Sequence, residues 1–167
     1  MPSLDKLAET IVCNTGPLIA LAGIDRLAVL EKLYSRVLVA EAVFRELTGS
    51  KRFASAATVF DLPWLEKRGL PAAPDPLLRS ELGEGEAQTI ALALQTKADR
   101  VLIDERKGRR VASLIYALKV TGTGGILLAA KRAGLVQEIG PLMQQMRANG
   151  YFVSARLIAG ICQAAGE

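Results

Sequence analysis

Two polar residues with oxygen-bearing side chains directly follow short apolar segments, a position from which a side chain can reach a bound ligand. Asn14 follows the apolar run 11–13, and Asp104 follows the run 100–103. If both runs are strands of a parallel sheet, their carboxyl ends share the edge outside which such sheets bind ligands. Glu46 and Glu86, on predicted helices, can reach the same edge. Crowded carboxylates repel each other and are tolerated mainly around a divalent cation, so these four residues predict a hard-cation site.

Each of the four residues also has a simpler interpretation when it is taken alone. Glu46 can be an exposed acid at the end of a helix, and Glu86 can be a first-turn acid that is favourable for the helix dipole. Asp104 can cap the helix that begins with Glu105, and Asn14 can form a turn with its own backbone. The convergence of all four at one sheet edge is what favours the site over the separate interpretations.

The types of residue that are missing restrict the chemistry further. The chain contains no histidine, which excludes serine–histidine and cysteine–histidine nucleophilic sites and the usual zinc constellations. Cys13 and Cys162 have neither a disulfide framework nor a metal-ligand spacing, and each is predicted to be a small buried hydrophobe. Carboxylates, hydroxyls, lysine, arginine or a bound ion must therefore carry any chemistry.

The elements that must position these residues alternate along the chain. Short, continuously apolar strands between helices are typical of a parallel sheet covered on both faces. The predicted fold class is therefore α/β, a three-layer α/β/α arrangement with a central parallel sheet of about four to five strands. The strands are predicted at 11–13, 36–40, 100–103 and 118–121, and the helices at 15–23, 25–34, 41–49, 83–98, 105–117, 122–134, 138–148 and 154–165, with weak helical character at 51–63.

Several helix boundaries carry local signals. Pro17 suits the first position of a helix, where its missing N–H costs nothing. Asp25 is expected to cap the helix 25–34, and Gly49 to end the helix 41–49. The clearest helix, 83–98, is predicted to bury one stripe of side chains. That stripe comprises Ala87, Ile90, Ala91 and Leu94.

Length and composition indicate one domain. The 167 residues are 50% hydrophobic and 23% charged, which is enough to bury a core. We expect a single domain over 1–167, in which 135–167 forms a helical carboxyl-terminal tail packed on the rest. The apolar runs are shorter than the roughly 18 residues of a membrane span, and the first residues lack a signal core. A cytoplasmic protein without a membrane partner is predicted.

Positive charge gathers after Asp104. The formal net charge of +4 is compatible with a polyanionic partner. The basic residues have the alternative interpretation of a solvated helix face, and the glycines of "TGTGG" can serve only to turn a strand into a helix. If a nucleic acid binds, the cations can steer its phosphates, and the threonines at the glycine-rich helix start can present N–H groups to a phosphate. These residues are Arg106, Lys107, Arg109, Arg110, Thr121 and Thr123.

Taken together and in order, five segments resemble a PIN-domain protein, and more narrowly a prokaryotic branch of predicted nucleic-acid-binding proteins. They are "IVCNTGPLIALAGIDRLAVLEKLY", "VLVAEAVFREL", "LGEGEAQTIALAL", "VLIDERKGRRVA" and "VTGTGGILLAAKRAGL". The similarity runs from about residue 11 to the tail. It implies a Mg²⁺- or Mn²⁺-dependent ribonuclease that acts on RNA, in many relatives the toxin of a toxin–antitoxin pair with an antitoxin protein as partner, and often a homodimer.

The resemblance also implies roles for individual residues. The four acids of the family fall on Asn14, Glu46, Glu86 and Asp104, which are then both metal ligands and catalytic residues. Thr15 matches a hydroxyl that usually follows the first acid, and we group it with the residues that contact nucleic acid. Asn14 departs from the pattern, because its amide oxygen can coordinate a hard cation but carries no charge. Weaker metal affinity is the expected consequence.

Two other functions remain as alternatives. A catalytically weak or inactive module of the same fold would bind nucleic acid or protein without metal-dependent cleavage, and Asn14 favours it. A nucleotide-binding α/β domain of another kind ranks last. The chain has no Walker motif, and "GEGEAQ" and "TGTGGIL" place Gln88 and Leu127 where the dinucleotide fingerprint has glycine.

Overall fold

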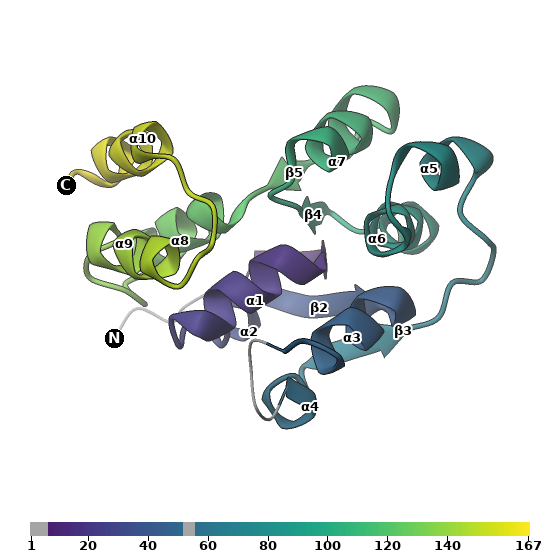
Figure 1. The fold of residues 1–167 in the computed structure, drawn as a ribbon, viewed down its shortest axis with the longest axis horizontal. Helices are drawn as coiled ribbons and strands as arrows, with labels where there is room; N and C mark the ends of the chain where they lie inside the picture. The colour runs from purple at the N-terminus through teal and green to yellow at the C-terminus, as the bar shows by residue number, and fades with distance from the viewer. Residues whose placement is uncertain (1–6, 52–55) are drawn as a thin grey trace.

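The computed structural model describes residues 7–51 and 56–167, and in this part of the chain five parallel strands form one sheet with helices on both faces (Figure 1). The order across the sheet is β3-β2-β1-β4-β5. This arrangement confirms the predicted three-layer α/β fold. The strands are β1 (Leu7–Cys13), β2 (Tyr34–Ala40), β3 (Leu65–Arg68), β4 (Arg100–Leu102) and β5 (Val120–Thr121).

The apolar run that ends at Asn14 lies in the middle of the sheet. Ile11, Val12 and Cys13 are fully buried, because β1 has β2 on one side and β4 on the other. Ile11 pairs with Val37 of β2, and Cys13 pairs with Leu102 of β4. A strand covered on both faces needs apolar side chains at every position, which explains why this run does not alternate. Cys13 is a free, buried thiol, and Cys162 is free and partly buried.

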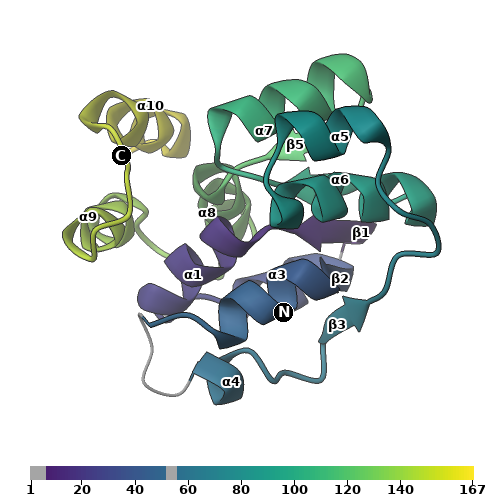
Figure 2. The same ribbon diagram turned by 45° about the vertical axis from the view of Figure 1, so that its right-hand side comes forward.

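The helices connect these strands and extend the chain after β5 (Figures 1 and 2). They are α1 (Thr15–Gly23), α2 (Val29–Leu33), α3 (Glu41–Thr48), α4 (Ala56–Val59), α5 (Pro76–Glu81), α6 (Glu84–Thr96), α7 (Arg106–Arg110), the π-helical segment η1 (Val111–Ile115), α8 (Thr123–Arg132), α9 (Gly140–Ala148) and α10 (Ala155–Ala165).

The strand order creates a crevice between β1 and β4. From β1 the chain moves outward to β2 and β3, then returns across the sheet to β4 on the other side of β1. Right-handed crossovers in opposite directions place the connecting helices on opposite faces. Accordingly, α6 packs on β1, β2 and β4, whereas α1 and α2 pack with α8. The carboxyl ends of β1 and β4 therefore form the switch point of the sheet, where ligands of α/β folds bind.

The last part of the chain packs beside the first helix. α10 packs on α8 and α9, and α9 packs on α1, an arrangement visible in both ribbon views (Figures 1 and 2). Glu167 accepts hydrogen bonds from the backbone of Ile139 and Gly140 and from Lys131 Nζ at 2.6, 2.9 and 2.7 Å. These donors lower the pKa of Glu167 to about 2. The two helices predicted in this region are present as α9 and α10.

The end of α1 corrects one prediction. Asp25 does not cap a helix at 25–34, since its backbone is left-handed with φ of 54° and α2 begins only at Val29. The N–H of Asp25 donates to Ala22 O and that of Arg26 donates to Leu21 O, the pair of bonds that ends a helix in a Schellman motif. Asp25 thus terminates α1. Pro17 is the third rather than the first residue of α1.

Other predicted boundaries differ in smaller ways. α6 buries Ala87, Ile90 and Ala91 as predicted, but Leu94 is 37% exposed. Edge strand β3 and helix α5 were not predicted. α5 begins in the proline-rich loop, where Asp75 caps it by accepting from the Leu78 N–H at 3.1 Å. Of the weak helix expected at 51–63, Ala56–Val59 is helical, and 52–55 lie outside the described residues.

Candidate active site

Asn14 connects the two strand ends of the crevice. Its backbone N–H donates to Leu102 O at 3.0 Å, so the chain leaves β1 hydrogen-bonded to β4. Asn14 is 7% exposed and stands at the N-cap position of α1, but its side chain makes no capping hydrogen bond. The side chain of this buried amide is therefore not accounted for by helix capping.

Glu46 and Thr15 join α3 to the start of α1. The Thr15 hydroxyl donates to Glu46 Oε2 at 2.6 Å, a short charge-assisted bond. Glu46 is exposed near the end of α3. A Cβ on Gly85 of α6 would lie only 2.5 Å from Glu46 Oε1. The glycine lets the carboxylate approach the first turn of α6.

Glu86 lies partly buried in the first turn of α6, whereas Glu84 faces outward and pairs with Arg45 at 2.9 Å. Burial raises the pKa of Glu86, and the neighbouring carboxylates of Glu105 and Glu46 raise it further, against a lowering by Lys107. The ionised form of Glu86 is therefore disfavoured by its surroundings.

Glu105 has a local structural role at the start of α7. Its carboxylate accepts the Gly108 N–H at 2.8 Å and caps α7, so this helix is not capped by Asp104. A Cβ on Gly108 would lie 3.5 Å from the carboxyl carbon of Glu86, which places Glu86 against the first turn of α7. We call Glu46, Glu86 and Glu105 the acid group.

Asp104 faces a different set of partners. Its Oδ1 accepts the Thr123 N–H at 2.7 Å, and its Oδ2 accepts the hydroxyls of Thr123 and Tyr151. A Cβ on Gly122 would lie 2.8 Å from Asp104 Oδ1 and 2.7 Å from Arg109 Nη1, so the start of α8 has room for both side chains only because residue 122 is glycine. Asp104 is thus hydrogen-bonded to α8 and the carboxyl-terminal region rather than to the acid group.

The four predicted cations of α7 do not have equal surroundings. Lys107 pairs with Glu81 at 3.2 Å, and Arg109 Nη1 donates to Ile103 O at 2.9 Å. Arg106 and Arg110 are exposed and make no ion pair with any described residue. These two guanidinium groups remain available to an anionic partner.

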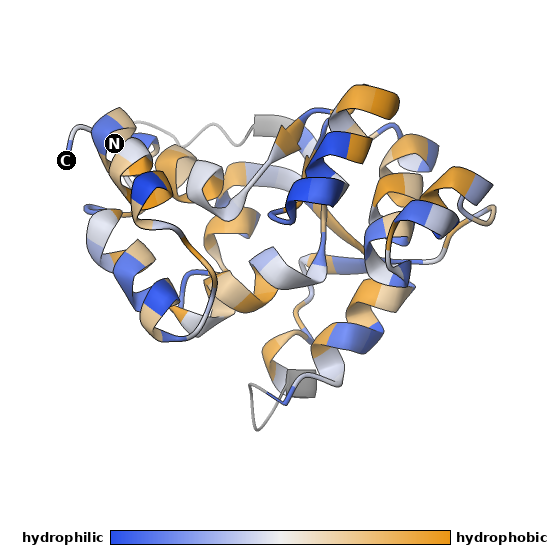
Figure 3. Cartoon of the chain, turned by 45° about the horizontal axis from the view of Figure 1, so that its top comes forward, coloured by the Kyte–Doolittle hydropathy of each residue, from blue (hydrophilic) through white to orange (hydrophobic). Residues whose placement is uncertain are grey.

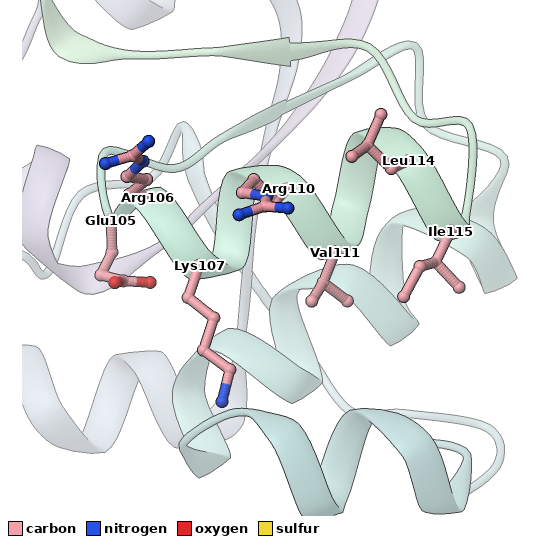
Figure 4. A pocket seen from close by; sticks show the side chains of 7 residues that line it. All are labelled: Glu105, Arg106, Lys107, Arg110, Val111, Leu114 and Ile115. Carbon is pink, nitrogen blue, oxygen red and sulfur yellow. The ribbon is translucent and has the colours of Figure 1, made fainter.

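A shallow groove of about 640 Å³ runs along α7 and η1 (Figure 4). Its first half is lined by Glu105, Arg106, Lys107 and Arg110, and its second half by the apolar side chains of Val111, Leu114 and Ile115. Figure 3 shows the corresponding change from a hydrophilic α7 to a hydrophobic η1. Leu114 is 74% and Ile115 54% exposed, so the groove has a basic half and an uncovered apolar half.

The predicted phosphate donors of α8 are largely engaged within the protein. Both the N–H and the hydroxyl of Thr123 are bonded to Asp104. The Thr121 hydroxyl lies against the first turn of α8, 2.6 Å from where a Cβ on Gly125 would stand. Phosphate binding at this helix start would therefore compete with contacts that Asp104 already makes.

Comparison with protein families matches residues 10–167 to the family described as PIN domain. The chain belongs to the PIN-domain family. This membership indicates a nuclease-type fold that binds nucleic acid, and PIN domains generally use divalent metal ions. No curated protein and no solved structure matches the chain. Among the described residues, no helix is long and apolar enough to cross a membrane.

The four predicted metal ligands of this PIN domain have the right chemistry for a divalent cation, but they do not stand together around one position. Every predicted ligand offers oxygen, which Mg²⁺ and Mn²⁺ prefer. The raised pKa of Glu86 marks a charge that a cation would compensate. Within 7–51 and 56–167, however, no three acidic or cysteine side chains stand together as a metal-holding group. The four predicted ligands are split between the acid group, which contains Glu46 and Glu86, and the separate surroundings of Asp104.

Tyr151 is the residue of this site that the sequence did not predict. It follows α9, lies 47 positions from Asp104 in the chain, and reaches the PIN-domain crevice only through the packing of the carboxyl-terminal helices. The one available signal was its presence as one of three tyrosines in a chain poor in aromatic residues. Nothing in the local pattern around residue 151 indicates which carboxylate it meets.

Proposed function

We propose that this PIN-domain protein is a divalent-metal-dependent endoribonuclease that hydrolyses RNA phosphodiesters. The observation that carries the proposal is Glu86, whose carboxylate is partly buried beside those of Glu46 and Glu105 at the carboxyl edge of the sheet, with a raised pKa. A protein gains nothing in stability from holding carboxylates this way without a cation. Such arrangements are characteristic of functional sites.

The metal ligands in this proposal are Asp104, Glu46 and Glu86, with the amide oxygen of Asn14 as an uncharged fourth. A Mg²⁺ or Mn²⁺ ion held by them would activate water and neutralise charge on the transferring phosphoryl oxygens. Thr15 orients Glu46 through its 2.6 Å hydrogen bond. Because Asn14 is uncharged, three carboxylates remain to attract the cation, so the attraction is weaker. The amide oxygen of Asn14 still completes a set of oxygen ligands.

The RNA is proposed to lie along α7. Arg106 and Arg110 offer unpaired guanidinium groups next to the acid group, and Lys107 and Arg109 add charge that is partly engaged within the protein. Contacts of this kind bind phosphates without reading the bases. Thr15, Thr121 and Thr123 complete the proposed nucleic-acid contacts at the rim of the crevice.

The wider biology remains part of the same proposal. A role as the toxin of a toxin–antitoxin pair, an antitoxin protein as partner, a homodimeric state and a cytoplasmic location are all implied by the resemblance to PIN-domain proteins. The apolar half of the α7–η1 groove offers a surface for a protein partner, because Leu114 and Ile115 are left uncovered.

Calorimetric titration of Mn²⁺ tests the metal site without knowledge of the RNA. We expect saturable binding by the wild-type protein and its loss in Asp104→Ala, since the variant removes one of three charged ligands. Glu138→Gln, which removes an exposed carboxylate after α8, is the matched control and should bind as the wild type does. Absence of binding by the wild type at millimolar Mn²⁺ would reject the nuclease.

A binding module on the same fold is the second candidate, and one observation favours it. Asn14 stands where the family has an acid, and the described side chains include no ready three-acid metal group. This candidate predicts RNA binding that is unchanged by EDTA and no cleavage in the presence of Mn²⁺. The calorimetric titration therefore separates the two functions.

A further inference from the structure

The hydroxyl of Tyr151 occupies the switch point of the sheet. It donates to Asp104 Oδ2, and a Cβ on Gly16 in the first turn of α1 would lie 3.5 Å from the same hydroxyl. The phenol thus stands between the start of α1 and the carboxylate that follows β4. The Tyr151 N–H donates to Met146 O at 3.1 Å, which anchors the residue to the end of α9.

The contacts of Asp104 leave little room for another ligand at Oδ2. A carboxylate oxygen has about two lone-pair sites. Oδ2 accepts two hydroxyls, from Thr123 and Tyr151, while Oδ1 accepts the Thr123 N–H at 2.7 Å. A cation that coordinates Oδ2 must therefore take the place of a hydroxyl. Thr123 is buried and bonded twice to Asp104, so the tyrosine is the partner more easily displaced.

We propose that Tyr151 is a positioning residue of this site, whose hydroxyl holds Asp104 toward α8 and must be displaced before Asp104 Oδ2 can join the acid group around a divalent cation. The inference rests on the proposed metal-dependent function. It accounts for the separation of Asp104, which Tyr151 holds, from the acid group, in which the carboxylates of Glu46 and Glu105 raise the pKa of Glu86. The carboxyl-terminal region thereby sets the affinity of the site for its metal.

The surroundings of Tyr151 allow such a displacement. A pocket of about 190 Å³ adjoins Asp104, Tyr151 and the residues after it, with Met143 and Met146 on its wall. Phe152, the next residue, is 93% exposed and does not anchor the segment in the core. The pocket offers the phenol a space into which it can turn away from Asp104.

The test compares the Mn²⁺ affinities of the wild type and Tyr151→Phe by calorimetry. Removing one hydroxyl that competes with the cation should tighten binding roughly three- to tenfold, the range that corresponds to the net contribution of one hydrogen bond. Tyr116→Phe is the matched control. It removes a phenol–carboxylate bond to Asp75 on the surface, at the start of α5, and should leave Mn²⁺ affinity unchanged.

A second comparison shows whether Tyr151 acts through Asp104. In an Asp104→Ala background, Tyr151→Phe should not restore Mn²⁺ binding, because the hydroxyl acts only through the Asp104 carboxylate. Hydrogen exchange provides a readout independent of affinity. Saturating Mn²⁺ should speed amide exchange at 150–153 in the wild type, because the anchor on Asp104 is released.

The outcomes separate this inference from the proposed function. Equal Mn²⁺ affinities for the wild type and Tyr151→Phe, or weaker binding by the variant, overturn the inference alone. Weaker binding would make Tyr151 an ordinary supporting donor of a ligating carboxylate. Binding by neither protein overturns the inference and the metal-dependent function together.

Discussion

At the scale of single residues, Glu86 shows a conflict between stability and a candidate function. Its carboxylate lies in the first turn of α6, where the helix dipole favours an acid, yet burial and two neighbouring carboxylates raise its pKa. Burial and the neighbouring carboxylates outweigh the helix dipole, because the net effect is a raised pKa of Glu86. We therefore expect the ionised side chain to lower the stability of the metal-free protein.

Glu86→Gln tests this expectation. Because the pKa of Glu86 is raised above 4.5 in the folded state, the folded protein holds the proton more tightly than the unfolded chain. Its stability therefore falls as pH rises through the window above 4.5. The variant should be more stable than the wild type at pH 7 in EDTA, by a few tenths of a kcal/mol up to about 1.

Urea unfolding at pH 7 and pH 4 provides the measurement. At pH 4, below the raised pKa of Glu86, its carboxyl is mostly protonated, so the stability gain of Glu86→Gln should largely disappear there. In saturating Mn²⁺ the order should reverse, since only the wild type gains stability from the ion. A variant that is no more stable than the wild type at pH 7 in EDTA would show that the neighbouring carboxylates do not strain the site.

At the scale of elements, the carboxyl-terminal helices reach the site because α10 packs closely on α8. A Cβ on Gly124, in the first turn of α8, would lie 2.0 Å from Ile161 Cδ1 of α10. An alanine at this position would force the end of the Ile161 side chain to move. Since Tyr151 lies in the connection between α9 and α10, the docking of α10 helps to hold the phenol on Asp104.

Gly124→Ala should therefore lower stability by about 1–2 kcal/mol, the cost of overpacking reduced by the helix-favouring effect of alanine. Gly160→Ala, in α10, is the matched substitution, because nothing lies within 4 Å of its new Cβ. It should raise stability by about 0.5–1 kcal/mol. Urea midpoints measure both changes in stability. Faster amide exchange over 155–165 in Gly124→Ala, but not in Gly160→Ala, would show that the destabilisation arises where α10 packs on α8. Equal stabilities would contradict the close packing of α10 on α8.

At the scale of the whole molecule, the fold gathers acids and free cations at one edge of the sheet. Arg106 and Arg110 follow β4 at its carboxyl end, next to the acid group. Lys32 and Lys119 precede β2 and β5, which places them at the opposite edge. The net charge of +4 therefore matters less than where the positive charges lie.

This distribution predicts how RNA binding depends on salt. The double variant Arg106→Ala, Arg110→Ala should bind a single-stranded oligouridine more weakly and reduce the slope of log affinity against log salt by about 1.4, or 0.7 for each phosphate contact. Lys32→Ala with Lys119→Ala removes the same charge from the other edge and should change the slope little. Fluorescence anisotropy in EDTA at several KCl concentrations measures both. Equal slopes for the two double variants would exclude α7 as the RNA-binding surface.

Much of the fold could be predicted from the sequence because its central strands have a recognisable apolar pattern. Continuous apolar runs at 11–13, 37–40 and 101–103 are buried on both faces and mark the carboxyl ends of β1, β2 and β4. β3 escaped prediction for the opposite reason. It is an edge strand in which only Leu65 is buried, and Glu66 instead pairs with Arg36 of β2 at 3.0 Å. Such a strand is stabilised by pairing with β2 rather than by an apolar pattern of its own.

The sequence by itself determined the family, the fold class and the residues that could form an oxygen-ligand site, because apolar periodicity and residue type are local properties. Only the tertiary structure decided which of these residues meet. It brought Glu46 and Glu86 together with Glu105, and it joined Asp104 to Tyr151 from 47 positions away. Hydrogen bonds between distant segments depend on how helices pack across the sheet, and no local pattern around either partner specifies that packing.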